Sequence, residues 1–304
     1  MPTPAVEARD LTKHYGAAVG LEALELRVEA GEVLGFLGPN GAGKTTTIRL
    51  LLDLIRPTRG EARLFGQPPG DPALRARIGY LPGELALDER FSGHRMLDFL
   101  DALRPPDAPP CDPARRGVLC ERLRLTEADL ARVIRDNSRG TKQKIGLVAA
   151  FQHDPELLIL DEPTTGLDPL VREEVFELLR ETGHAGRTVF HSSHVLSEVD
   201  RTCTRVAVLR AGRLVAEDRI DALRARLTRR MVVRFRDAPP LDELDVPGAE
   251  LVGHEDGQVT LAVTGELDPL LQVLARHPVS HLAFPEPELD EAFLHLYAGG
   301  EARP

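Results

Sequence analysis

The chain contains 304 residues, which is enough for one large domain and a small one, or for two of medium size. Its net charge of −10 argues against general nucleic-acid binding, and its three cysteines, odd in number and without metal-ligand spacing, suit a reducing compartment rather than a disulfide framework. No apolar run approaches the roughly 20 residues of a membrane-spanning helix, and the opening MPTPAVEARD is unlike a signal peptide, so we expect a cytoplasmic protein that reaches a membrane only through a partner.

Residues 3–30 alternate apolar and polar positions and predict antiparallel strands. The apolar run EVLGFLG predicts a buried strand next, and TTTIRLLLDLI has apolar residues at helical spacing. Between them, Gly38, Gly43, Lys44 and Thr45 fit the phosphate-binding template G-x-x-x-x-G-K-[ST] in the strand-to-helix setting that the template requires. A glycine-rich turn with an incidental lysine is the alternative, and it leaves the agreement of template and setting unexplained.

The residue types of this loop favour phosphate binding. Its glycines let the backbone curl so that several N–H groups point inward, and the N-terminus of the following helix adds partial positive charge. A polyphosphate is therefore expected there, with Lys44 reaching the terminal phosphates and the Thr45 hydroxyl able to ligate magnesium.

The middle of the chain predicts a further strand at RARIGYLPG and then a helical region at about 84–152. The prolines of RPPDAPPCDP, residues 104–113, break the first two of these helices apart. Beyond this region, the apolar runs PELLILDEP and RTVFHSSH alternate with helical patterns, and RVAVLRAGRLVAE predicts a closing hairpin. Such alternation predicts an α/β fold with a parallel sheet.

Two acids, Asp161 and Glu162, end the strand predicted at PELLILDEP. They emerge at the carboxyl end of the strand, where ligand sites of α/β sheets lie. One acid there can help to hold magnesium, and the next can orient or deprotonate an attacking water. An acidic strand end that caps a helix is the alternative. Together with the phosphate loop, the acids predict one nucleotide site.

The composition shifts near residue 220, where we expect a boundary between residues 1–220 and an accessory domain at 221–304. The basic stretch IDALRARLTRR is predicted helical, and the remainder predicts a small α+β unit. Its arginines can face anionic lipid head groups, although a solvated helix face is the simpler interpretation. These arginines are Arg224, Arg226, Arg229 and Arg230.

Four ordered motifs resemble those of the ATP-binding subunit of ABC (ATP-binding cassette) transporters, over roughly residues 5–220. GPNGAGKTT is similar to the Walker A loop of that family, and LLILDEPTTGLDP to its Walker B strand and D-loop. NSRGTKQKIGL lies where the LSGGQ signature belongs, and SSHVLSEVD carries a switch histidine. The resemblance implies a P-loop NTPase cassette with a RecA-like parallel sheet core, an antiparallel β subdomain and a helical subdomain.

The resemblance also implies an ATPase that uses ATP and Mg2+. Glu162, His194 and Lys44 are the implied catalytic residues, and Thr45 and Asp161 the implied metal ligands. The implied nucleotide-binding residues are Tyr15, Gly38, Pro39, Asn40, Gly41, Ala42, Gly43, Lys44, Thr45, Thr46, Ser138, Gly140 and Asp168. A lone histidine is more often structural, and we expect that of His191.

Ser138 and Gly140 precede a helix, so a hydroxyl and backbone N–H groups form a second anion site in the same chain. In the family two subunits pair head to tail, so the resemblance implies a homodimer in which each signature covers the opposite ATP. An ordinary N-cap is the alternative for Ser138. Tyr15 aligns with the aromatic residue that stacks on adenine, and a half-buried strand residue is its alternative.

The sequence departs from the family at two places. Gly83 stands after YLP, where the family usually has a glutamine, so either Glu84 takes over the metal contact or the site works without it. In the signature, Asn137 replaces a leucine and Arg139 replaces a glycine. Arg139 can approach phosphate or ADP, but charged loop residues mostly face solvent.

PELDEAFLHLYAG, near the end of the chain, resembles the tail of ATPase subunits in bacterial drug and antibiotic exporters of the daunorubicin-resistance-like group. The expected function is therefore that of the ATP-hydrolysing subunit which powers export through a separate integral membrane permease, at the inner face of the cell membrane. No nucleic acid partner is expected. A soluble ABC ATPase acting on ribosomes or DNA is the alternative, and a non-catalytic regulatory binder is a third.

Overall fold

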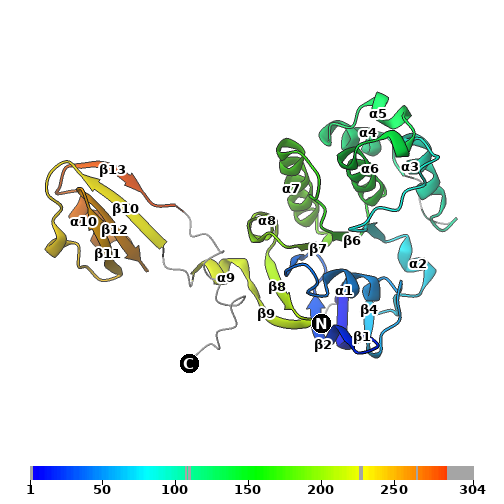
Figure 1. Ribbon diagram of the computed structural model, residues 1–304, viewed down its shortest axis with the longest axis horizontal. Helices are drawn as coiled ribbons and strands as arrows, with labels where there is room; N and C mark the ends of the chain where they lie inside the picture. The colour runs from blue at the N-terminus through cyan, green and yellow to red at the C-terminus, as the bar shows by residue number, and fades with distance from the viewer. Residues whose placement is uncertain (1–2, 107, 109–110, 226–228, 265, 286–304) are drawn as a thin grey trace. The chain divides into compact units, whose positions relative to one another are not determined.

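The computed structural model describes residues 3–106, 108, 111–225, 229–264 and 266–285. It divides the chain into two compact units, residues 1–220 and 221–304, which we call the N-terminal unit and the C-terminal unit (Figure 1). Each unit has a hydrophobic core of its own.

A six-stranded sheet forms the centre of the N-terminal unit. Its strands, in spatial order, are β5 (Ile78–Leu81), β6 (Leu157–Asp161), β7 (Thr188–Ser193), β3 (Val33–Leu37), β8 (Arg205–Arg210) and β9 (Arg213–Arg219). All neighbours pair in parallel except β8 and β9, which form the predicted hairpin. Strands β3, β6 and β7 are buried at every residue, as expected for a parallel sheet covered on both faces. The parallel α/β prediction is confirmed.

A smaller antiparallel sheet is formed by two strands that precede the phosphate loop in the sequence and one strand that follows it. It has the order β2 (Ala18–Val28), β1 (Val6–Tyr15) and β4 (Arg59–Leu64). This confirms the antiparallel strands that alternation predicts for residues 3–30. Their buried side chains belong to the same core cluster as those of β3 and α1.

Helices connect the strands of these two sheets. They are α1 (Lys44–Leu51), α2 (Pro72–Arg75), α7 (Pro169–His184) and α8 (Leu196–Thr202). Helix α8 approaches β3 closely because residue 35 is glycine: a Cβ there would lie 2.3 Å from Val199 Cγ1. This contact holds α8, and with it the segment after β7, against the centre of the sheet.

The helical region lies between β5 and β6 and forms a group of its own in Figure 1. Its elements are α3 (Gly93–Ala102), α4 (Pro113–Arg122), α5 (Glu127–Ala131), the short 3-10 helix Ile134–Asp136, and α6 (Arg139–Phe151). Helix α3 ends before the proline-rich stretch, and α4 begins at its last residue, Pro113, with the Asp112 side chain accepting from Ala114 N–H at 2.9 Å. The predicted break between the two helices is confirmed.

The C-terminal unit is a four-stranded antiparallel sheet with helices, so the α+β prediction is confirmed. Its strands, in spatial order, are β11 (Ala249–Glu255), β12 (Gln258–Val263), β10 (Arg229–Phe235) and β13 (Val279–Ala283). Its described helices are the 3-10 helix Leu241–Glu243, α10 (Asp268–Leu274) and all of α9 (Ile220–Ala225) except the first residue, which belongs to the N-terminal unit. Its core joins Met231, Val233 and Leu261 of the sheet to Leu270 and Leu274 of α10.

One predicted helix is shorter than expected. We expected IDALRARLTRR to be helical, but α9 ends at Ala225 and β10 begins at Arg229, which pairs with Val263. Sheet pairing and burial of alternate residues of β10 outweigh the helical tendency of these arginines. Arg226 and the segment PELDEAFLHLYAG lie outside the described residues.

Candidate functional site

The phosphate loop connects the buried strand β3 to helix α1. Gly43 is the N-cap of α1 with φ of 107°, and a Cβ there would lie 2.4 Å from the carbonyl oxygen of Gly20, so this position requires glycine. A cavity of about 190 Å3 opens at the loop. It is lined by Gly20, Asn40, Gly41, Ala42, Gly43, Lys44, Thr45, Thr46 and Glu162. The loop and the acid after β6 therefore share one cavity.

Lys44 is buried within the loop that it belongs to, with 5 % of its surface exposed. Its Nζ donates to the carbonyl oxygen of Gly38 at 2.6 Å and lies 3.4 Å from Glu162 Oε1. The ammonium group is thus held between the loop backbone and the acid, where a terminal phosphate of a bound nucleotide can meet it.

Thr45 and Asp161 bring two oxygen ligands together. Thr45 Oγ1 donates to Asp161 Oδ2 at 2.7 Å, and Asp161 ends β6 with only 2 % of its surface exposed. Magnesium prefers oxygen ligands and commonly binds through one or two protein groups together with substrate phosphates. A hydroxyl and a carboxylate in contact beside a phosphate loop fit that ion.

Glu162 lies at the centre of the site. Its backbone has φ of 50°, a conformation that non-glycine residues rarely adopt. Its Oε1 faces Lys44, while Oε2 lies 3.1 Å from Nδ1 of His194, the residue that follows β7. The structure therefore brings Lys44, Thr45, Asp161, Glu162 and His194 together from the ends of β3, β6 and β7.

Tyr15 ends β1 and is half exposed, at 50 %. Its ring lies directly against Gly20, where a Cβ would be 2.8 Å from Tyr15 Cε2, and Gly20 in turn lines the loop cavity. The Lys13 ammonium lies 5.3 Å from the centre of the ring. An exposed aromatic face beside the cavity is suited to stacking on a base.

Ser138, Gly140 and Asp168 do not line this cavity. Ser138 caps α6 and accepts from Thr141 N–H at 3.0 Å, while Asp168 caps α7 and accepts from Val171 N–H at 3.1 Å. A Cβ on Gly140 would lie 2.9 Å from the carbonyl oxygen of Gly166, so the two loops touch each other. They form a second polar surface, separate from the phosphate loop within one chain.

The two departures from the family pattern have distinct positions. A Cβ on Gly83 would lie 3.0 Å from Asp161 Oδ2, so the chain after β5 passes right beside the metal-ligand candidate. The side chain of Glu84 is exposed. Arg139 is also exposed, and its aliphatic part lies 3.7 Å from a Cβ placed on Gly166.

Sequence reasoning missed three residues that support the site. Ser192 is fully buried and contacts both acids at the end of β6. The buried carboxylate of Glu198 accepts from Thr164 Oγ1 and from Ser193 Oγ, each at 2.8 Å. Gln143 of α6 donates to the carbonyl oxygen of Pro163 at 3.0 Å. The available signal is their position in the motifs: Ser192 and Glu198 lie in SSHVLSEVD, and Gln143 lies in NSRGTKQKIGL.

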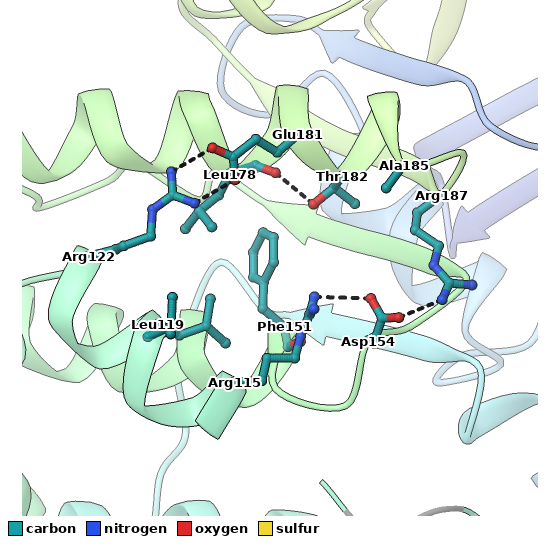
Figure 2. Close-up of a pocket in the computed structure, with 11 residues that line it drawn as sticks. Arg115, Leu119, Arg122, Phe151, Asp154, Leu178, Glu181, Thr182, Ala185 and Arg187 are labelled. Atoms are coloured by element: carbon teal, nitrogen blue, oxygen red, sulfur yellow. Dashed lines mark hydrogen bonds and ion pairs between the residues drawn. The ribbon is translucent and has the colours of Figure 1, made fainter. Parts of the chain in front are cut away.

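A different cavity, of about 270 Å3, lies between α4, the end of α6 and α7 (Figure 2). It is lined by Arg115, Val118, Leu119, Arg122, Phe151, Asp154, Leu178, Glu181, Thr182, Ala185 and Arg187. Arg115 and Arg187 both pair with Asp154, and Arg122 pairs with Glu181. Each of these arginines is thus paired with a carboxylate of the same chain.

Among the described residues, no helix is both long and apolar enough to cross a membrane.

Comparisons with known proteins fit this geometry. Residues 21–165 match the family model described as ABC transporter. The chain is 36 % identical to the daunorubicin resistance ATP-binding protein DrrA3 of Streptomyces coeruleorubidus, over 97 % of this chain and 96 % of that protein. It is 34 % identical to the Nod factor export ATP-binding protein I of Rhizobium meliloti, over 97 % and 88 % of the two chains.

Solved structures agree. A structure of an ATP-binding subunit of an ABC transporter is 31 % identical and superposes with a TM-score of 0.65, covering 72 % of this chain and 92 % of that one. The dimeric cassette MJ0796, in a post-hydrolysis state bound to ADP and Pi, has the same TM-score of 0.65 at 21 % identity, over 71 % and 98 % of the chains. The second likeness is one of fold.

Proposed function

The chain belongs to the family of ABC transporter ATP-binding subunits, and from that membership we propose how its residues hydrolyse ATP to power export through a separate membrane permease. The observation that carries the proposal is a connected set of contacts at the loop cavity. Lys44, Thr45 and Glu162 line that cavity, Asp161 contacts Thr45, and His194 contacts Glu162. The first two belong to the phosphate loop and α1, and the others follow or end neighbouring parallel strands.

The polyphosphate of ATP lies in the loop formed by residues 38–46. The backbone N–H groups of the loop and the Lys44 ammonium bind its oxygens, and Tyr15 stacks on the adenine. Thr45 and Asp161 hold Mg2+, which, when bound, neutralises charge that develops on the phosphates. The 2.7 Å contact between Thr45 and Asp161 supports this pairing of ligands.

Glu162 orients the attacking water and accepts its proton as the water oxygen forms a bond to the γ-phosphorus. The bond from that phosphorus to the β-γ bridging oxygen breaks in line, which releases ADP and phosphate. His194 donates to the γ-phosphate and responds to its loss. Its Nδ1 lies 3.1 Å from Glu162 Oε2, which supports a position beside the reacting phosphate. Lys44 stabilises the charge that develops on the phosphoryl oxygens.

The second polar surface acts in a homodimer. Ser138 and Gly140 of one copy cover the ATP bound to the other, and Asp168 lies at the same interface. The exposure of Ser138 and its position outside the loop cavity of its own chain support this arrangement. ATP closes the dimer, and hydrolysis reopens it.

The partner is an integral membrane permease at the inner face of the cell membrane, and the helical region at 84–152 transmits the motion to it. The relatives that match nearly the whole chain are named for daunorubicin resistance and for Nod factor export. We propose that the protein takes part in drug or antibiotic export, which the relatives named for daunorubicin resistance support, with substrate specificity mainly in the permease and with no nucleic acid partner.

Affinity capture of the tagged chain from membranes of its native cell tests this proposal. The capture is performed with and without ATP. We expect a polytopic membrane protein to be recovered with the chain in stoichiometric amount. Recovery of ribosomes or DNA-repair proteins without a membrane partner would contradict the permease and leave the ATPase site intact.

A further inference from the structure

Ser192 occupies the one position of β7 that lies directly beside Asp161. Strands β6 and β7 are parallel neighbours, and their register pairs Asp161 with Ser192. On its other side Ser192 pairs with Phe36 of β3, next to the start of the phosphate loop. The residue is fully buried, at 0 % exposure. The sheet itself therefore fixes where its hydroxyl can reach.

The Ser192 hydroxyl bonds to both acids at once. Its Oγ donates to Asp161 Oδ1 at 2.5 Å and accepts from the backbone N–H of Glu162 at 3.1 Å. The direction of these bonds is set by chemistry, because an ionised carboxylate can only accept and an amide N–H can only donate. The single proton of the hydroxyl goes to Asp161, and a lone pair takes the proton of the amide.

These bonds fix the two acids in complementary ways. The Asp161 carboxylate is held on one oxygen by Ser192 and on the other by Thr45 of α1, so its plane cannot rotate without losing a bond. The backbone of Glu162 turns with φ of 50°, a strained conformation for a non-glycine residue that persists only where the surroundings hold it. Ser192 supplies an acceptor that holds this turn.

We propose that Ser192 is a positioning residue of the ATPase, which orients Asp161 toward the metal and sets the backbone turn that aims Glu162 at Lys44 and His194. This inference rests on the proposed roles of Asp161 and Glu162. Ser192 is fully buried and its hydroxyl bonds to both acids, so it acts through them. A buried strand serine that merely satisfies local polar atoms would affect folding but not the metal or the turnover step.

Ser192→Ala is the test, in the full-length chain. Loss of a supporting bond to a metal ligand typically lowers metal affinity or activity by about 10- to 100-fold, and we expect a fall in kcat of that size. KM for ATP at saturating Mg2+ should change less than about threefold, because the loop N–H groups bind the phosphates independently. Electron paramagnetic resonance of Mn2+ in the presence of a non-hydrolysable ATP analogue provides a second readout, and we expect Mn2+ to bind at least about fivefold more weakly.

Thr188→Val is the matched control. Thr188 is also buried on the same strand, and its hydroxyl accepts from Gly31 N–H at 3.0 Å, away from both acids. This variant should melt at a lower temperature yet keep wild-type kcat and Mn2+ affinity. If Thr188→Val loses kcat and Mn2+ affinity as much as Ser192→Ala, the effect is general destabilisation and the inference fails.

Ser192→Cys covers the case in which the alanine variant does not fold. A thiol of similar size donates and accepts only weakly, so an intermediate loss of kcat and Mn2+ affinity is expected. Wild-type kcat and Mn2+ affinity in a folded Ser192→Ala or Ser192→Cys protein would overturn the inference. The proposed function fails separately, if Glu162→Gln retains turnover.

Discussion

At the residue scale, the two histidines of the segment after residue 190 differ in their surroundings. His191 is buried inside β7, with Nε2 2.9 Å from Thr202 Oγ1 and 3.0 Å from Cys203 Sγ. Burial lowers the pKa of His191 to about 4. His194, by contrast, is half exposed and faces Glu162. From the sequence we expected His191 to have a structural role, and its burial agrees with that expectation.

The buried His191 predicts acid sensitivity of the fold. Its pKa is about 4 when folded and 6.5 when unfolded, so the unfolded chain binds the extra proton between these pH values. The free energy of unfolding should be highest above pH 6.5 and should fall as the pH drops toward 4, by roughly 3 kcal/mol from this residue. Urea titrations at pH 7.5 and pH 5 on wild type and His191→Gln check this: the variant should lose less stability on acidification. Equal losses would remove His191 as the cause.

The acids and the loop residues of the site could be predicted because each group is contiguous in the sequence and has a spacing with chemical meaning. Ser192 and Glu198 could not be assigned in that way. The bond from Ser192 to Asp161 joins residues 31 positions apart, and only the register of β6 against β7 brings them into contact. Serine in an apolar strand carries no signal of which neighbour it will face.

At the scale of elements, the phosphate loop depends on one glycine more than on another. Gly43 and Gly41 both have positive φ, at 107° and 79°. A Cβ on Gly43 would lie 2.4 Å from the backbone oxygen of Gly20, whereas a Cβ on Gly41 meets nothing within 4 Å. Replacing either with alanine strains the backbone by about 1–2 kcal/mol, but only Gly43→Ala must also displace β2.

We therefore expect Gly43→Ala to weaken ATP binding by at least about tenfold more than Gly41→Ala does, because both variants share the backbone strain and only Gly43→Ala adds the clash with Gly20, and about 1.4 kcal/mol corresponds to a tenfold change. Titration with a fluorescent ATP analogue measures both affinities. Similar losses in the two variants would show that the clash with Gly20 does not control the shape of the loop.

The order of the elements was predictable from hydrophobic periodicity and proline placement. The parallel strands, the antiparallel strands at 3–30 and the break between α3 and α4 all follow from such local signals. The end of α9 could not be predicted from local signals, because Arg229 has helical tendency but pairs with Val263 in a sheet. Pairing between residues that are far apart in the sequence sets the secondary structure of this segment, and the local sequence carries no sign of it.

At the scale of the whole molecule, the two units have separate cores. The core of the C-terminal unit contains residues of 221–304 alone, and the nucleotide site contains residues of 1–220 alone. Units with their own cores can unfold in separate transitions. A ligand that binds one native unit stabilises that unit selectively.

Calorimetry should thus resolve two unfolding transitions. ATP with Mg2+ should raise the midpoint temperature of only the transition that belongs to the N-terminal unit. Val233→Ala, at a position with 0 % exposure, should destabilise the other unit by about 1–3 kcal/mol and leave ATP affinity unchanged. A single transition that shifts as a whole with ATP would contradict independent units.

The measurement that tests the account most directly is ATP turnover by Glu162→Gln, together with nucleotide retention and particle size. Glutamine keeps the shape of Glu162 but cannot accept the proton of the attacking water. We predict that turnover falls by at least about 100-fold, within the range expected when a positioned base is lost, while the variant retains ATP and elutes as a dimer. Turnover at the wild-type rate would remove Glu162 from the catalytic role and contradict the account.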